Sequence, residues 1–272
     1  MKKKLLDIQN LSVTINKKKI VDRFDLSIKT GELHVLMGPN GSGKSTIAYS
    51  ILGHPGFTVR AAQLSFEDKN LKQLTTDERA RLGIFLGFQY PLAVNGISLS
   101  SVIPAALEYR IKQKRVKKRV YATLASRMAY EQHVAREWFR GDIAENLASL
   151  GMQEEMLYRS LNEGFSGGEK KKAEVLQMLA LSPKLAILDE PDSGLDVDAL
   201  RRIAKAIHRA HQGGMAILLI THYQRILKYL RPDRVHIVSG GRLSRSGGPE
   251  LARMIERHGY ESLNPHGHKN KR

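Results

Sequence analysis

Residues 33–53 read LHVLMGPNGSGKSTIAYSILG, and this stretch decides the fold. The compact apolar run at residues 33–37 predicts a strand, and the segment GPNGSGKS at residues 38–45 satisfies the pattern G-x-x-x-x-G-K-[ST] in full. The following TIAYSILG has helical composition and stops at Gly53, a usual helix-ending residue. The stretch therefore predicts a strand, a glycine-rich loop and a helix, in the order that a phosphate-binding loop requires.

Residues 38–45, the phosphate loop from here on, have the composition of a site for nucleotide phosphates. Glycines let backbone N–H groups converge on phosphate oxygens, and the start of the helix adds a partial positive charge. We expect Lys44 to reach the β- and γ-phosphates and the Ser45 hydroxyl to ligate Mg²⁺. The competing interpretation, a glycine-rich turn that happens to precede a helix, is disfavoured by the elements predicted on either side. The expected nucleotide-binding residues here are Gly38, Pro39, Asn40, Gly41, Ser42, Gly43, Lys44, Ser45 and Thr46.

Two adjacent acids follow the apolar run LAIL at residues 185–188. A phosphate loop needs a carboxylate at the end of a nearby strand to hold its metal, and Asp189 is placed for Mg²⁺, directly or through water. Glu190 is the natural general base for an attacking water molecule. Without the phosphate loop, the same acids would indicate only the solvated start of a loop.

Residues 165–169, FSGGE, open a further helical segment. Ser166 and Glu169 have the spacing of a capping box, which predicts a well-capped helix. The Ser166 hydroxyl and the unencumbered glycine amides, that of Gly168 among them, also form an anion site competent to hold a γ-phosphate. Both interpretations can hold at once.

Gln89 and His222 complete the candidate site. Gln89 lies between the phosphate loop and a helical segment, and by itself it would be an ordinary loop glutamine. His222 follows the apolar run at residues 215–220 and is expected at the C-terminal end of a strand, the edge where open α/β sheets bind ligands. We expect His222 to hydrogen-bond the γ-phosphate.

The wider pattern indicates an α/β fold. Short β-like runs separated by turns over residues 5–37 predict a strand-rich N-terminal lobe. From about residue 100 to 160 apolar residues recur near the helical period, which predicts a helical insert. Compact apolar runs at 185–188, 215–220 and 235–238 alternate with helix-length segments, and this alternation predicts a parallel sheet with crossover helices.

Composition excludes several classes of protein. The chain has 272 residues, no cysteine, and 44 Lys and Arg against 27 Asp and Glu, for a formal charge of +17. The absence of cysteine excludes a disulfide framework, a thiolate nucleophile and cysteine-ligated metal sites. Polar residues interrupt the apolar N-terminal stretch, and no window approaches the roughly 18 apolar residues of a membrane span. A cytoplasmic protein without direct membrane insertion is expected.

The positive charge is segregated along the chain. Residues 110–119 hold seven cations and no acid, and residues 201–272 hold fifteen cations against four acids. Residues 141–200 hold twelve acids against five bases. The run at 110–119 is either a solvated helix face or a surface that docks onto an acidic protein. Nucleic acid is the less favoured partner because no aromatic-rich basic platform or groove-reading helix is evident.

The ordered set of phosphate loop, Gln89, FSGGE, LAILDE, the SGLD of residues 193–196 and His222 resembles the ATP-binding-cassette ATPases over nearly the whole chain. The resemblance implies a single-domain P-loop NTPase with an N-terminal antiparallel β lobe, a parallel-sheet core and an inserted helical subdomain. The implied parts are a nucleotide-binding core at 1–95 and 161–262, a helical insert at about 96–160 and a flexible basic tail at 263–272.

The same resemblance implies ATP hydrolysis by dimers that close head to tail when ATP binds. Ser166 and Gly168 would touch the γ-phosphate held by the opposite subunit, and Asp196 would link the two sites. Gln89 would contact Mg²⁺ and report the nucleotide state to the helical insert.

More narrowly, the segments GFQYP, GFSGGEKK, DSGLDVDAL, ITHYQRIL and PDRVHIV resemble the SufC-type ATPases of the SUF iron–sulfur cluster assembly system. The expected partners are then SufB-like and SufD-like scaffold proteins, which would supply the cluster ligands that this cysteine-free chain lacks. The alternative is the ATPase subunit of a membrane transporter, with the same catalytic residues. A further hypothesis is that Lys171 pairs with Glu190 and slows hydrolysis in the isolated subunit.

Overall fold

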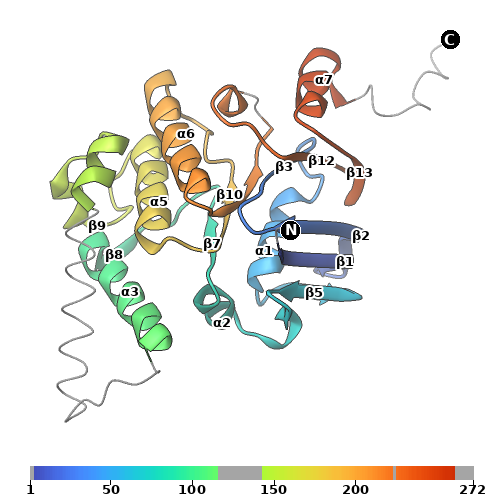
Figure 1. The fold of residues 1–272 in the computed structure, drawn as a ribbon, viewed down its shortest axis with the longest axis horizontal. Helices are drawn as coiled ribbons and strands as arrows, with labels where there is room; N and C mark the ends of the chain where they lie inside the picture. Colours follow the sequence, from blue (N-terminus) through green and yellow to red (C-terminus); the bar gives the residue numbers. More distant parts are fainter. Residues whose placement is uncertain (1–2, 116–142, 223–224, 261–272) are drawn as a thin grey trace. The chain divides into compact units, whose positions relative to one another are not determined.

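The computed structural model describes residues 3–115, 143–222 and 225–260. They form two compact units, and most of the helices and strands are labelled in Figure 1. The first unit contains Met1–Gln89, Lys184–Ser193 and His208–Arg272, and the second contains Tyr90–Pro183 and Gly194–Ile207. Part of the basic run at 110–119 and the whole tail at 263–272 lie outside the described residues.

The first unit begins with an antiparallel sheet, which confirms the predicted strand-rich lobe. Its strand order is β2-β1-β5-β6, with β4 paired to β1. The β-like runs at residues 5–9 and 11–15 belong to one strand, β1. The left-handed Asn10 between them (φ 55°) forms a bulge that shifts the pairing register with β2 without ending the strand. The strands are β1 (Lys4–Ile15), β2 (Lys18–Lys29), β4 (Thr58–Arg60), β5 (Gln63–Phe66) and β6 (Lys69–Asn70).

The core sheet has the order β13-β12-β3-β11-β10-β7. Neighbouring strands are parallel, as predicted, except for β13, which runs antiparallel to β12 at the edge. The sequence did not predict β13, which runs antiparallel because a tight turn returns the chain directly beside β12. The strands are β3 (Leu33–Met37), β7 (Ile84–Gly87), β10 (Leu185–Asp189), β11 (Ala216–Ile220), β12 (Arg234–Ser239) and β13 (Arg242–Gly247).

Helix α1 (Lys44–Leu52) follows the phosphate loop and packs against both sheets. Its buried side chains belong to the same apolar core as those of β1, β2 and the core strands. The helix ends at the left-handed Gly53 (φ 84°), as predicted. Buried Arg79 of α2 (Thr76–Arg81) donates to two carbonyls of the last turn of α1, at 2.9 and 3.0 Å. The Ser50 carbonyl also accepts from the capping Gly53 N–H at 3.2 Å, and Arg79 adds a donor to each of the two carbonyls at this helix end.

The second unit carries the described part of the predicted helical insert. Strands β8 (Val94–Ser98) and β9 (Ser160–Leu161) pair antiparallel, α3 (Leu99–Arg115) contacts α5 (Gly167–Leu181), and residues 143–150 are helical. The insert boundaries near residues 96 and 160 stay a prediction. The other elements are η1 (Leu71–Gln73), η2 (Glu154–Leu157), η3 (Ile226–Lys228), α7 (Glu250–His258) and α6 (Val197–Gln212), which begins in the second unit and ends in the first. No helix within the described ranges has the length and apolar character needed to cross a bilayer.

Two buried histidines lie side by side in the core sheet. His34 of β3 and His236 of β12 are 1% and 5% exposed, and Nδ1 of His34 lies 3.0 Å from Nε2 of His236. Their other ring nitrogens lie 3.1 Å from a Glu32 carboxylate oxygen and 2.8 Å from the Ser246 hydroxyl, respectively. Burial, and then the neighbouring His34, lower the pKa of His236 to about 3. Burial also lowers the pKa of His34.

The buried His236 should make the fold less stable in mild acid. Its pKa falls from 6.5 to about 3 on folding, so between these pH values the unfolded chain binds a proton that the folded chain does not. Its contribution to the free energy of unfolding should be complete above pH 6.5 and fall by about 1.4 kcal/mol per pH unit below it. In urea unfolding measured at several pH values, the free energy of unfolding of His236→Gln should fall less steeply below pH 6.5 than that of the wild type. An equal decline would contradict the assigned pKa.

The turn between β12 and β13 offers a matched pair of glycines. Gly240 (φ 54°) and Gly241 (φ 77°) are both left-handed. A Cβ at Gly241 would lie 2.2 Å from the carbonyl oxygen of Ile20, whereas a Cβ at Gly240 would meet nothing within 4 Å. Gly240→Ala should lower the free energy of unfolding by about 1 kcal/mol, and Gly241→Ala by about 1–3 kcal/mol more. Thermal unfolding measures both, and equal Tm values would count against the close contact.

Candidate active site

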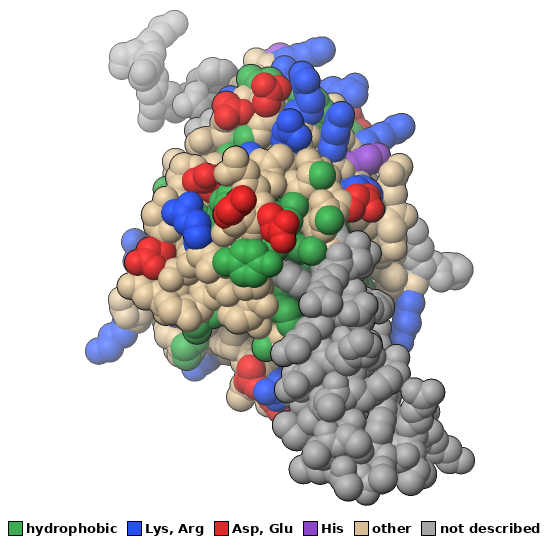
Figure 2. Space-filling model, turned by 90° about the vertical axis from the view of Figure 1, so that its left-hand side faces the viewer, with side chains coloured by type: hydrophobic (Ala, Val, Ile, Leu, Met, Phe, Trp, Pro, Cys, Tyr) green, Lys and Arg blue, Asp and Glu red, His purple; other side chains and the backbone are tan. Residues whose placement is uncertain are grey.

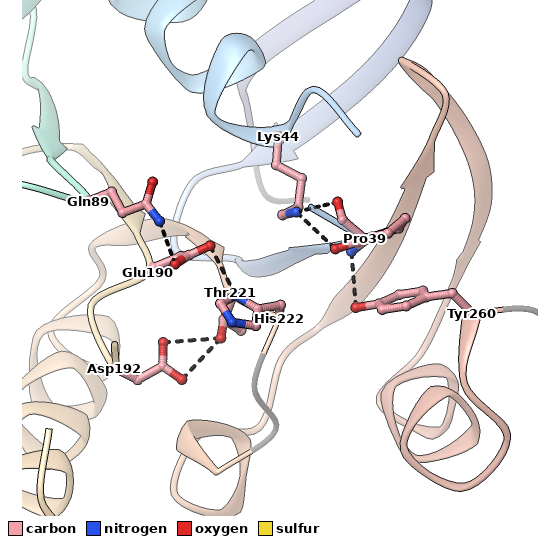
Figure 3. A network of polar contacts seen from close by, with 9 residues as sticks. Pro39, Lys44, Gln89, Glu190, Asp192, Thr221, His222 and Tyr260 are labelled. Atoms are coloured by element: carbon pink, nitrogen blue, oxygen red, sulfur yellow. Dashed lines mark hydrogen bonds and ion pairs between the residues drawn. The ribbon is translucent and has the colours of Figure 1, made fainter. Parts of the chain in front are cut away.

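The phosphate loop lies between β3 and α1, as predicted, and its lysine is folded back onto it (Figure 3). Lys44 Nζ donates to the carbonyl oxygens of Gly38 at 2.8 Å and Pro39 at 3.0 Å. Burial lowers the pKa of Lys44, and the nearby carboxylates of Glu190 and Asp189 act in the opposite direction. A desolvated ammonium held by neutral carbonyls gains from exchanging them for charged phosphate oxygens.

The first residue of the loop leaves no room for a side chain. A Cβ on Gly38 would lie 2.2 Å from the carbonyl oxygen of Val238 in β12 and 2.8 Å from Ser42 Oγ. The Gly38 N–H donates to the Tyr260 hydroxyl at 3.2 Å. Ser42 Oγ is buried and has no hydrogen-bond partner within the described part of the chain. A buried hydroxyl of this kind in a glycine-rich cradle fits a phosphate oxygen as its partner.

Glu190 lies between Gln89 and His222 and contacts both of them (Figure 3). Its Oε2 accepts a hydrogen bond from Gln89 Nε2 at 2.7 Å, and its Oε1 lies 3.0 Å from His222 Nδ1. The three residues follow β7, β10 and β11, whose C-terminal ends meet at one edge of the parallel sheet. The backbone of Glu190 is left-handed (φ 50°), a conformation that costs a non-glycine residue about 1–3 kcal/mol and is concentrated at functional sites.

A buried pair of polar residues supports the strand that carries His222. The Thr221 hydroxyl donates to both carboxylate oxygens of Asp192, at 3.1 and 3.0 Å. Asp192 is fully buried, and this burial raises its pKa, against the opposing hydrogen bond from Thr221. Sequence reasoning missed both residues. The available signal was the position of Asp192 just after Glu190.

Three predicted metal ligands lie in the first unit, and their chemistry fits Mg²⁺. Ser45 is in the first turn of α1, Asp189 is the last residue of β10, and Gln89 follows β7. They supply a hydroxyl, a carboxylate and an amide oxygen, the hard ligands that Mg²⁺ prefers. The Gln89 amide nitrogen is engaged with Glu190, which leaves its amide oxygen for a cation. The Asp189 carboxylate is 1% exposed and close enough to Lys44 to affect its pKa.

The other predicted nucleotide contacts belong to the second unit. The backbone N–H of Ser166 donates to the Glu169 carboxylate at 2.8 Å, and the Glu169 N–H donates to the Ser166 hydroxyl at 3.3 Å, which confirms the capping box. A Cβ on Gly168 would meet only Leu195, at an ordinary 3.6 Å. The Asp196 side chain accepts from the Ala199 N–H at 2.7 Å, at the start of α6. Contact of Ser166, Gly168 and Asp196 with nucleotide stays a prediction.

Buried Lys171 forms an ion pair with Glu174 on its own helix, with 3.8 Å between Nζ and Oε2. This pair gives Lys171 a structural role in α5. The expected restraint of Glu190 by Lys171 stays a prediction.

Known proteins with this sequence pattern and fold are ATP-binding cassettes. A model of the ABC transporter family matches residues 21–193. The chain is 42% identical over 263 residues to a probable ATP-dependent transporter, ycf16, of Cyanophora paradoxa, which covers 97% of this chain and 96% of that protein. A solved ATP-binding subunit of an ABC transporter matches with a TM-score of 0.72 at 23% identity, over 95% of this chain and 97% of that one. A bacterial ABC transporter cassette solved as a dimer matches with a TM-score of 0.68 at 19% identity, over 90% and 98%. The structural matches confirm the predicted P-loop NTPase cassette fold.

Proposed function

Because this chain belongs to the ABC transporter family, whose cassettes bind ATP with Mg²⁺ and hydrolyse ATP, we propose that it drives an iron–sulfur cluster assembly complex. In this proposal, head-to-tail dimerisation on ATP remodels a SufB–SufD-like scaffold in the cytoplasm, and hydrolysis resets it. The observation that supports the catalytic part best is the contact of Gln89 and His222 with the two carboxylate oxygens of Glu190.

In this proposal each residue of the site has a part in hydrolysis. The loop amides and Lys44 bind the phosphates, with the ammonium leaving the carbonyls of Gly38 and Pro39 to do so. Glu190 accepts a proton from the attacking water, and Gln89 holds the carboxylate that receives it. His222, at the end of β11, donates to the γ-phosphate. Ser45, Asp189 and Gln89 would hold Mg²⁺, which would supply positive charge to neutralise the phosphates.

The choice of a scaffold partner rests on sequence motifs, and an exposed apolar surface offers a docking site for a partner of either kind. The segments GFSGGEKK and ITHYQRIL resemble the SUF ATPases. Directly after Gln89, large apolar side chains of the second unit are exposed by 38–82%, namely Tyr90, Leu92, Val94 and Ile97. Figure 2 shows hydrophobic side chains at the surface on one face of the molecule. Exposed apolar residues following a nucleotide-contacting residue suit the docking of a partner that must sense ATP.

The alternative partner is the membrane domain of a transporter. The family description and the printed name of the Cyanophora relative favour this function. A transporter subunit would use the same catalytic residues and the same exposed residues after Gln89. The identity of the bound partner therefore separates the two functions.

The catalytic roles can be tested by two substitutions with opposite effects. Lys44→Ala should abolish ATP binding, because it removes the cation that faces the phosphates. Glu190→Gln should bind ATP, lose hydrolysis by at least about 100-fold and accumulate as an ATP-bound dimer, because an amide cannot accept the proton from water. Equilibrium binding, phosphate release and size-exclusion chromatography with ATP measure these properties. Normal turnover by Glu190→Gln would remove it as the base.

The partner can be identified by affinity purification of the tagged chain from the soluble fraction and from detergent-extracted membranes of its own cells. SufB-like and SufD-like proteins should be recovered from the soluble fraction, whereas recovery of a membrane permease would support the transporter instead. Tyr90→Ser with Leu92→Ser should abolish this recovery and leave ATP binding intact. Tyr158→Ser is a comparison variant, because Tyr158 is 66% exposed in the same unit and lies just before β9, which pairs with β8; its effect shows how far the docking surface extends beyond β8.

A further inference from the structure

The end of the described chain reaches back to the start of the phosphate loop. Tyr260 follows α7 and the left-handed Gly259 (φ 67°), and its hydroxyl oxygen accepts the Gly38 N–H at 3.2 Å across 222 residues of sequence (Figure 3). The ring is half-buried, and burial raises the pKa of its hydroxyl. A neutral phenol at this position can accept the amide hydrogen bond over the whole physiological pH range.

Gly38 is held on three sides. Its carbonyl accepts from Lys44, its N–H donates to Tyr260, and its Cα faces the carbonyl of Val238 so closely that no side chain fits. When Lys44 turns to phosphate, its contact with the Gly38 carbonyl is lost. The Tyr260 hydrogen bond and the β12 backbone then define the direction in which the chain enters the loop.

We propose that Tyr260 is a positioning residue of the phosphate loop. Its hydroxyl orients the first peptide of the loop, and this orientation sets the direction of the amides that follow toward the phosphates. Tyr260 itself does not touch nucleotide. The inference rests on the proposed role of residues 38–45 in phosphate binding.

A purely structural role, as an anchor for α7, gives a different expectation. The helix is already fixed by three buried apolar side chains on one face, Leu251, Ala252 and Ile255, which are 4–5% exposed. Loss of one hydroxyl at the far end leaves these contacts intact. Removal of the hydroxyl alone therefore tests the bond to Gly38 and not the packing of α7.

The test is Tyr260→Phe in the full chain, with Tyr229→Phe as the matched control. Tyr229 is half-buried, follows η3, and has no described hydrogen bond to the phosphate loop. For Tyr260→Phe, the Kd for Mg-ATP should rise about 3- to 10-fold, the range expected for loss of one hydrogen bond. The kcat at saturating ATP should be unchanged, and hydrogen exchange should accelerate at residues 38–45. The control should match wild type in all three.

An unchanged Kd for Tyr260→Phe would overturn the inference. Faster hydrogen exchange confined to α7, with none at the phosphate loop, would overturn it as well and leave an anchoring role. Lys44→Ala, measured in parallel, separates this failure from that of the proposed function. If Lys44→Ala loses ATP binding while Tyr260→Phe binds normally, only the role of Tyr260 fails, whereas normal binding by Lys44→Ala removes the phosphate-loop assignment itself.

Discussion

The nucleotide site depends on the absence of space beside Gly38. The carbonyl of Val238 occupies the position where a side chain would project, so the phosphate loop leaves β3 in close contact with β12. α1 continues from the loop and packs against both sheets, and Arg79 satisfies carbonyls at its other end. Because both ends of this segment are held by backbone contacts in a packed core, the loop amides are arranged before a ligand arrives, which lowers the entropic cost of binding.

The charged side chains near the phosphate loop are buried, and this burial determines how strongly they interact with other charges. Lys44, Asp189, Glu190 and Asp192 are each at most 6% exposed, and burying charged groups costs free energy unless partners compensate. Hydrogen bonds to neutral groups provide part of the compensation, as for Lys44 and Asp192. A triphosphate with its magnesium ion would supply charges of both signs to these residues. The free energy spent on burying the charges in the protein alone would then favour binding.

The phosphate loop and the helix ends could be predicted from the sequence because short sequence patterns encode them. The phosphate loop, the capping box at Ser166 and the helix end at Gly53 each require a particular residue at a fixed short spacing. The β-bulge at Asn10 and the antiparallel β13 were not foreseen, because register and strand direction depend on what the strand pairs with. The capping roles of Ser166 and Asp196 also show that a residue expected to contact a ligand can serve its own helix.

The sequence by itself determined the family and the reaction type and predicted the central residues, since these follow from short motifs and their order along the chain. Only the tertiary structure decided which side chains contact Glu190 and which groups Asp192, Arg79 and Tyr260 contact. Tyr260 lies 222 residues from its partner Gly38. No local pattern encodes such a pairing, because it forms only when the chain has folded and buried backbone donors must find acceptors from distant parts of the sequence.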